Sequence, residues 1–163
     1  MLISPHMKIE EEIRQSKFRN THHKAMINLI FTSNWLTTKQ SEQLKPHGIT
    51  GQQFNILRIL KGQHPQSISA TSIKARMLDK NSDISRLLDR MESKGLIEKK
   101  VSANDKRAFD VTISTFGLSV LGEVDKVTRD TDAFLGLTET EAAQLSDLLD
   151  KCRDSFKALL SPP

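Results

Sequence analysis

The fold is decided by the stretch SDISRLLDRMESKGLI at residues 82–97. Its apolar residues recur at i, i+3, i+4 and i+7, at Ile84, Leu87, Leu88 and Met91. This spacing predicts an amphipathic helix with a single apolar stripe. Lys94-Gly95 predicts its end, because a cation suits the negative end of the helix dipole and glycine readily adopts the left-handed cap conformation.

Two short strands are predicted directly after this helix. Residues 96–101 form the first, and residues 109–113 form the second, in which apolar and polar residues alternate with period two. The connecting loop, residues 102–108, is charged and contains Asp105, Lys106 and Arg107. The pattern therefore predicts a β-hairpin with a basic tip.

Two further helices are predicted before residue 82. Thr50-Gly51-Gln52-Gln53 has the pattern of a capping box and opens a helix of about three turns. Ser69 can cap a short helix that carries Ile73, Met77 and Leu78. The order helix, short helix, helix and hairpin is that of a winged helix-turn-helix.

Longer helices are predicted on both sides of this unit. Residues 8–44 read as one long helix, with or without a break, which Pro46-His47-Gly48 ends. Ser114 caps another long helix that we expect to end at Gly136. A second capping box at residues 138–141 opens a last helix. The predicted fold is thus mainly α with a small β-hairpin wing.

Composition and charge narrow the class of protein. The 163 residues suit one domain with extensions, and the single cysteine cannot form an internal disulfide. No segment resembles a membrane span or a signal peptide, so a cytoplasmic protein is expected. Residues 74–107 hold ten basic and six acidic residues, whereas residues 114–163 hold five and nine. The basic region suits a polyanion such as nucleic acid, although many basic proteins bind none.

Several segments resemble MarR-type regulators. Residues 87–97 followed by Asp105-Lys106-Arg107 are similar to the recognition helix and wing of that family, residues 49–57 to the start of its second helix, and residues 112–117 to its strand-to-helix junction. The resemblance covers about residues 25–158. It implies a bacterial or archaeal homodimer with dimerisation helices at residues 1–48 and 114–163 and a DNA-binding domain at residues 49–113. Residues 1–6 are either native or vector-derived, since Met7 is also a plausible start.

Candidate DNA-binding residues follow from their type and position. Taken alone, residues 82–92 fit an ordinary amphipathic helix with a solvated face; taken with the hairpin, they favour double-stranded DNA as the partner. The homodimer that the resemblance implies presents two such helices with twofold symmetry, so a palindromic operator is expected. Arg86 is the main candidate for base contacts because a guanidinium pairs bidentately with guanine. Asp105 is expected to orient Arg107 or Arg90 rather than contact DNA. Ser82 and Ser85 are further candidates for base edges, because they are expected on the exposed face of the same helix. Asn81 and Ser69, at helix starts, are candidates for phosphate contacts, and Lys106 and Arg107 are candidates for phosphate or minor-groove contacts. With Arg90, which ranks below Arg86, the complete set of candidate DNA contacts is Ser69, Asn81, Ser82, Ser85, Arg86, Arg90, Lys106 and Arg107.

The resemblance also implies a small-molecule effector held between the dimer helices and the DNA-binding part. Residues of the first long helix are candidates for its pocket, or equally for the dimer core: His22, His23, Met26, Ile30, Phe31 and Trp35. The long terminal helices, each apolar on one side, favour a dimer over packing within a monomer.

Other chemistry has little support in the sequence. Adjacent His22 and His23 point apart on a helix, so no metal site is expected. Cys152 lies on the apolar side of the last helix, and a buried inert thiol is favoured over a redox sensor. No cofactor or catalytic motif is present, so no enzyme is expected. The predicted function is a DNA-binding transcriptional regulator, a repressor released by an effector, and the alternative is a winged-helix protein-interaction module.

Overall fold

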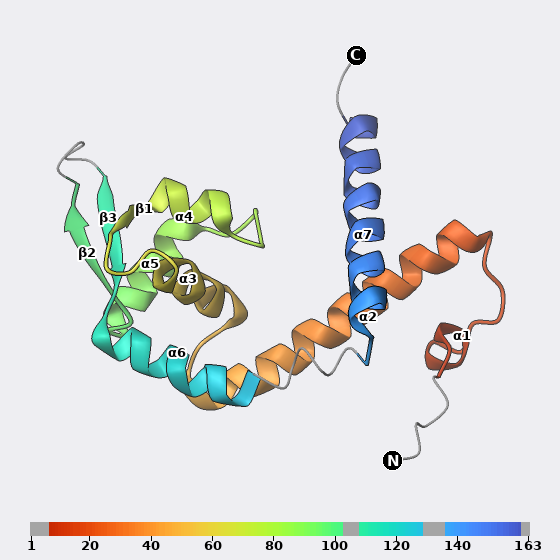
Figure 1. Ribbon diagram of the computed structural model, residues 1–163, viewed down its shortest axis with the longest axis horizontal. Helices are drawn as coiled ribbons and strands as arrows, with labels where there is room; N and C mark the ends of the chain where they lie inside the picture. The colour runs from red at the N-terminus through yellow and green to blue at the C-terminus, as the bar shows by residue number, and fades with distance from the viewer. Residues whose placement is uncertain (1–6, 103–107, 129–135, 161–163) are drawn as a thin grey trace. The chain divides into compact units, whose positions relative to one another are not determined.

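The computed structural model describes residues 7–102, 108–128 and 136–160. Its chain forms two compact units, residues 1–124 and 125–163, and each is described by itself. The elements of the first unit (Figure 1) are α1 Ile9–Glu12, α2 Thr21–Leu44, the 3-10 helix η1 Lys45–His47, α3 Gly51–Lys61, β1 Ile68–Ser69, α4 Ala70–Arg76, α5 Ile84–Ser93, β2 Ile97–Val101, β3 Phe109–Ile113 and most of α6 Thr115–Thr128. The second unit holds the end of α6 and α7 Glu139–Leu160.

The sheet has three strands in the order β1-β3-β2, all antiparallel. The predicted hairpin is confirmed, with Ile97 opposite Ile113 and Val101 opposite Phe109. Strand β1 was not predicted, because this two-residue strand is defined only by its pairing with β3. The predicted fold class is confirmed, with this third strand added.

The helix-turn-helix forms largely where the capping residues predict it. The Thr50 hydroxyl accepts a hydrogen bond from the amide of Gln53, whose side chain accepts one from the Thr50 amide, so the first capping box is confirmed. Ser69 caps α4 by accepting from the amide of Ser72. Helix α4 ends at Arg76, so Met77 and Leu78 lie beyond the helix that we expected to carry them.

Helix α5 ends in a Schellman motif. The Gly95 amide donates to the Glu92 carbonyl over 2.8 Å, and the Leu96 amide donates to the Met91 carbonyl over 2.9 Å. Gly95 has φ of 69°, which a glycine adopts without steric cost. The buried side chains of Leu96 and Met91 accompany these bonds. The predicted helix end is therefore confirmed, and it turns the chain directly into β2.

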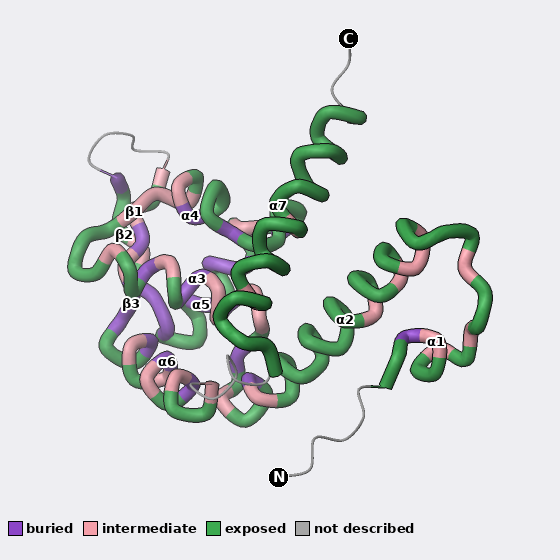
Figure 2. The backbone as a smooth tube through the Cα atoms, turned by 45° about the vertical axis from the view of Figure 1, so that its right-hand side comes forward, coloured by how far each residue is buried: buried purple, intermediate pink, exposed green. Residues whose placement is uncertain are grey.

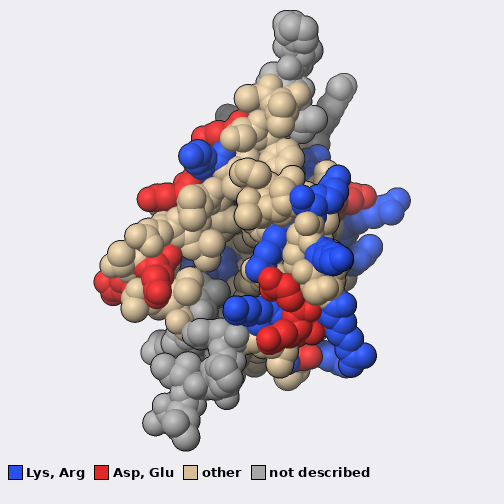
Figure 3. Space-filling model, turned by 90° about the vertical axis from the view of Figure 1, so that its right-hand side faces the viewer, with Lys and Arg blue, Asp and Glu red and all other residues tan. Residues whose placement is uncertain are grey.

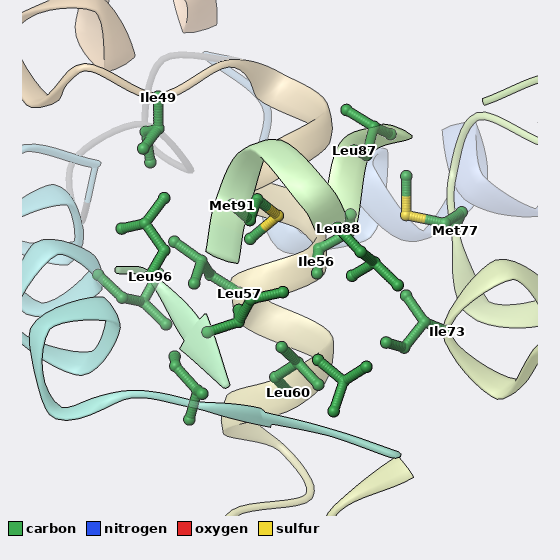
Figure 4. Packing of buried hydrophobic residues seen from close by; sticks show 14 of the residues in the cluster. Ile49, Ile56, Leu57, Leu60, Ile73, Met77, Leu87, Leu88, Met91 and Leu96 are labelled. Carbon is green, nitrogen blue, oxygen red and sulfur yellow. The ribbon is translucent and has the colours of Figure 1, made fainter. Parts of the chain in front are cut away.

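The core lies among the helix-turn-helix, the sheet and α6. Ile56, Leu57 and Leu60 of α3 face Leu88 and Met91 of α5 in the interior (Figure 4). Burial of each such side chain contributes roughly 1.5–3 kcal/mol relative to leaving it exposed. The remaining core residues come from the adjoining elements: Leu44, Ile49, Ile73, Met77, Leu87, Leu96, Ile97, Val111, Ile113, Leu121 and Val124. This packing fixes which face of α5 points outward.

The N-terminal helix is interrupted rather than continuous. Helix α1 ends at Glu12, and α2 starts at Thr21 because the Asn20 side chain accepts from the His23 amide and caps it. An ion pair between Glu10 and Lys24 ties the two helices together. Helix α2 has a single buried residue, Leu44, over its 24 residues, and it is mostly green in Figure 2.

The C-terminal helices begin as predicted. The Ser114 hydroxyl accepts from the Gly117 amide over 2.9 Å and donates to the Gly95 carbonyl, so it caps α6 and binds the end of α5. Thr138 and Glu141 form the second capping box, at the start of α7. Helix α6 is described as far as Thr128, and the expected end at Gly136 falls beyond residues 129–135, which lie outside the described part. None of the described helices is long and apolar enough to cross a membrane.

Candidate nucleic-acid interface

Helix α5 presents a polar face opposite the side that it buries. Leu87, Leu88 and Met91 point into the core, whereas Ser85, Arg86 and Arg90 are exposed. The Arg86 side chain is 78% exposed, and its Nε lies 3.2 Å from Asp83 Oδ2, one turn earlier on the chain. The structure thus places these three sequence-predicted residues on one outward-facing surface. A solvated Arg–Asp pair of this kind is weak, so the guanidinium can exchange it for a base or a phosphate.

The predicted position of Ser82 is wrong. We expected it on the exposed face, but it lies before the N-cap residue Asp83 and is buried. Its hydroxyl donates to Asp79 Oδ2 over 2.9 Å and lies 3.1 Å from Gln52 Nε2. Gln52 Nε2 also donates to Asp79 Oδ2, over 2.8 Å. Ser82 therefore fastens the turn between α4 and α5 to α3 and does not project toward a ligand.

Asp79 is the centre of this turn network. Its pKa lies below its ordinary value because the Gln52 side chain, the Asn81 amide and the Ser82 hydroxyl all donate to its carboxylate. Next to it, the Leu78 amide donates to Asn55 Oδ1 over 2.9 Å. The role of Asp79 was not predicted from the sequence, since one of its partners, Gln52 on α3, lies 27 positions away.

The two helix-start candidates differ in their surroundings. Asn81 is exposed, and its amide is held by Asp79. Ser69 is half-buried, because its hydroxyl contacts both the amide and the hydroxyl of Ser72 while capping α4. Lys74 and Arg76, which the sequence analysis did not single out, are exposed on α4. The sequence feature that could have pointed to these two residues is the excess of basic residues over positions 74–107.

The wing is described up to its tip. The Ser102 amide donates to the Ala108 carbonyl over 2.9 Å, so the hairpin pairing extends past β2. Asp105, Lys106 and Arg107 lie outside the described residues, and their roles stay predictions. At the base of the wing, Lys99 makes ion pairs with two acidic residues of α5, a link that sequence analysis did not find.

The candidate effector residues lie along α2. Met26, Ile30 and Trp35 are 44%, 53% and 47% exposed, so one chain alone does not bury them. His22 is exposed and Phe31 is half-buried. His23 is half-buried, and its Nδ1 lies 3.3 Å from the Arg19 amide that donates to it. Figure 3 shows uncharged side chains, polar and apolar alike, in tan beside Lys and Arg in blue and Asp and Glu in red.

The predicted burial of the Cys152 thiol is also wrong. We expected a buried thiol, but Cys152 is exposed on α7. Among residues 7–102, 108–128 and 136–160, no three His, Cys, Asp or Glu side chains are arranged to hold a metal ion.

A sequence model of the MarR family matches residues 47–108, from the last residue of η1 through α3, α4, α5 and β2. The chain is 30% identical over 116 residues to the HTH-type transcriptional repressor IacR of Pseudomonas putida, covering 70% of this chain and 68% of that protein. It is 28% identical to the transcriptional repressor MprA of Escherichia coli over 55% of this chain, and it spans only about half (51%) of MprA.

Solved structures show the same fold. A MarR variant from E. coli, complexed with operator DNA, has a TM-score of 0.66 and 27% identity, covering 78% of this chain and 93% of that one. The MepR–DNA complex of S. aureus has a TM-score of 0.73 at 22% identity, covering 81% and 97%, which supports the fold alone.

The helix-turn-helix, the hairpin wing and the outward face of α5 define a winged-helix regulator of transcription. The chain belongs to the MarR family. The predicted family and the predicted class, a DNA-binding transcriptional regulator, are thereby confirmed. The matched relatives IacR and MprA are named as repressors of transcription.

Proposed function

We propose that this chain acts as a homodimeric repressor that binds a palindromic operator and is released by a small-molecule effector. The observation that carries this proposal is the outward face of α5, where Ser85, Arg86 and Arg90 are exposed while the opposite face is locked into the core. A rigid helix of ten residues with such a face fits the major groove of B-DNA.

The residues divide between base contacts and backbone contacts. Arg86 and Ser85 are proposed to contact base edges, and Arg90 to contact DNA or to support the wing. Ser69 and Asn81, at helix starts, are proposed to contact phosphates, which suit the positive end of a helix. The wing residues Lys106 and Arg107, with Asp105 as their support, are proposed to hold the backbone or enter the minor groove.

The homodimer is proposed from apolar side chains that the chain leaves exposed on its long helices. Those of α2 are Met26, Leu29, Ile30, Trp35 and Leu36, and those of α7 are Leu145, Leu148, Phe156 and Leu159. Such apolar faces mark interaction sites in soluble proteins. A second copy would bury them and present two α5 helices with twofold symmetry. Residues 1–48 and 114–163 are thus proposed as dimerisation segments around a DNA-binding domain at residues 49–113.

The effector site is proposed near the same part of α2. His22 and His23 supply polar groups there, and Met26, Ile30, Phe31 and Trp35 supply apolar surface. A pocket of apolar lining with few polar groups is the usual form of a small-molecule site. A repressor of this kind acts on genomic DNA, so the proposed location is the bacterial or archaeal cytoplasm.

A mobility-shift assay tests the proposal. The probe is a duplex of the intergenic DNA beside the chain's own gene, with a random-sequence duplex of equal length as the control. We expect preferential binding to an imperfect palindrome whose half-site centres lie roughly 10 base pairs apart. The logarithm of the affinity should fall linearly with the logarithm of the salt concentration, by about 0.9 per phosphate neutralised. Affinity that ignores salt, or equal affinity for both duplexes, would favour the protein-interaction module instead.

A further inference from the structure

Lys99 lies where the recognition helix meets the wing. Its Nζ is 2.7 Å from Asp89 Oδ1 and 2.8 Å from Glu92 Oε2, and both carboxylates belong to α5. The same Nζ is 5.5 Å from the centroid of the Phe109 ring on β3. Only 15% of the Lys99 side chain is exposed, compared with 68% for Asp89 and 44% for Glu92. One ammonium group therefore contacts three side chains from two elements.

The contacts follow from the register of the chain. Asp89 and Glu92 are three positions apart, so they share one face of α5. Lys99 lies opposite Val111 in the hairpin, two pairs from Val101 and Phe109 and therefore on the same face of the sheet. Since the Lys99 side chain is only 15% exposed, its ion pairs are less screened than pairs in which both side chains are fully exposed. The pKa of Lys99 is raised by hydrogen bonds first with Asp89 and then with Glu92, so the side chain stays charged.

We propose that Lys99 is a positioning residue that sets the placement of the wing relative to α5 and thereby lets both contact one DNA duplex. The inference rests on the proposed function, because it assigns Lys99 a part in DNA binding without a contact to DNA. Strand β2 leads from α5 into the hairpin, so a shift at Lys99 moves β2 and its partner β3 relative to α5. Two elements that grip one rigid duplex tolerate little displacement between them.

A purely electrostatic role of Asp89 and a role in holding Lys99 predict opposite effects of its removal on DNA affinity. If Asp89 acted only as a negative charge near DNA, its removal would lessen repulsion from the phosphates and strengthen binding. If Asp89 holds Lys99, its removal weakens binding although the protein becomes more positive. A phosphate contact by Lys99 itself also differs, because its loss would make the salt dependence shallower by about one unit.

The experiment uses the full chain and five variants. Lys99→Met removes the charge, Lys99→Arg keeps it, and Asp89→Ala removes one partner. The matched controls, Lys100→Met and Glu98→Ala, remove an exposed cation and an exposed carboxylate from the same strand. Affinity is measured by fluorescence anisotropy on the intergenic duplex and on a random duplex at several salt concentrations, and urea unfolding reports stability.

We expect Lys99→Met to bind the intergenic duplex about tenfold more weakly, which corresponds to ~1.4 kcal/mol, with an unchanged salt slope. Asp89→Ala should weaken binding in the same direction, Lys99→Arg should restore most of it, and Glu98→Ala should not weaken it. A folded Lys99→Met with wild-type affinity, or with a salt slope shallower by one unit, overturns the inference.

Asp89→Ala decides the matter if Lys99→Met does not fold, because this exposed position tolerates alanine in a helix. Weaker binding then supports the positioning role, and equal or tighter binding overturns it. The two proposals fail in distinguishable ways. Wild-type protein that binds neither duplex refutes the proposed function, whereas wild-type binding with unaffected variants refutes only the role of Lys99.

Discussion

Gly117→Ala is expected to destabilise the protein, although alanine is the better helix former. Gly117 lies in the first turn of α6, where the helix passes over the end of α5. A Cβ added there would lie well inside contact distance of the Leu96 carbonyl oxygen and only 3.0 Å from Ile113 Cγ1. That carbonyl also accepts a hydrogen bond from the Ser114 amide over 3.1 Å. Backbone on both sides of the contact leaves no flexible side chain to move away.

The size of the effect follows from three contributions. Overpacking of this kind costs about 1–3 kcal/mol, and stretching the Ser114–Leu96 hydrogen bond costs a further ~0.5–1.5 kcal/mol. The helix propensity of alanine offsets about 1 kcal/mol. We therefore expect a net loss of about 2 kcal/mol in the free energy of unfolding.

Gly122→Ala is the matched control. Gly122 lies in the same helix, and an added Cβ would meet nothing within 4 Å. Here the propensity acts alone, so stability should rise by roughly 0.5–1 kcal/mol. Both free energies are measured by urea unfolding followed by circular dichroism, at one fixed protein concentration because dimerisation would shift the midpoint. Equal effects of the two substitutions would refute the close approach of α6 to Leu96.

Three further predictions concern DNA binding, acid stability and assembly. Arg86→Ala should cost about 1–3 kcal/mol of binding free energy on the intergenic duplex and less on random DNA, whereas Lys106→Ala should weaken binding to both duplexes alike. Fluorescence anisotropy on both duplexes measures these affinities. An unchanged ratio of the two affinities for Arg86→Ala would contradict a base contact by Arg86. Asp79 has a folded-state pKa below its ordinary value of 3.8, so its contribution is present above that pH and is lost as the pH falls through the lower folded value. Asp79→Asn should thus be less stable than wild type at pH 7, and the difference in the free energy of unfolding should close below about pH 4. Urea unfolding over this pH range measures the difference, and a difference that does not change with pH would exclude this linkage. Sedimentation of the wild type should give about twice 18.4 kDa, and deletion of residues 138–163 should abolish the dimer or cause aggregation; a compact monomer in either case would argue against the dimer.

Local sequence determined the elements and most of their ends. The capping boxes at Thr50 and Thr138, the Ser114 cap and the glycine end at Gly95 were all predictable, because each depends on side chains within three or four residues of the backbone groups that they satisfy. The hairpin was predictable because alternation with period two and the charged loop mark it. The outward direction of Arg86 followed from the apolar stripe on the other side of α5.

Only the tertiary structure decided where partners distant in sequence meet. Ser82 is buried because Asp79 and Gln52 converge on it, and Lys99 belongs to the site because the chain turns back at Gly95 and places β2 beside α5. The exposure of Cys152 also depends on what covers α7, which an apolar pattern does not reveal. A pattern reports the preference of each residue for water or for the interior, whereas a contact between distant residues depends on how whole elements pack, which no local preference specifies.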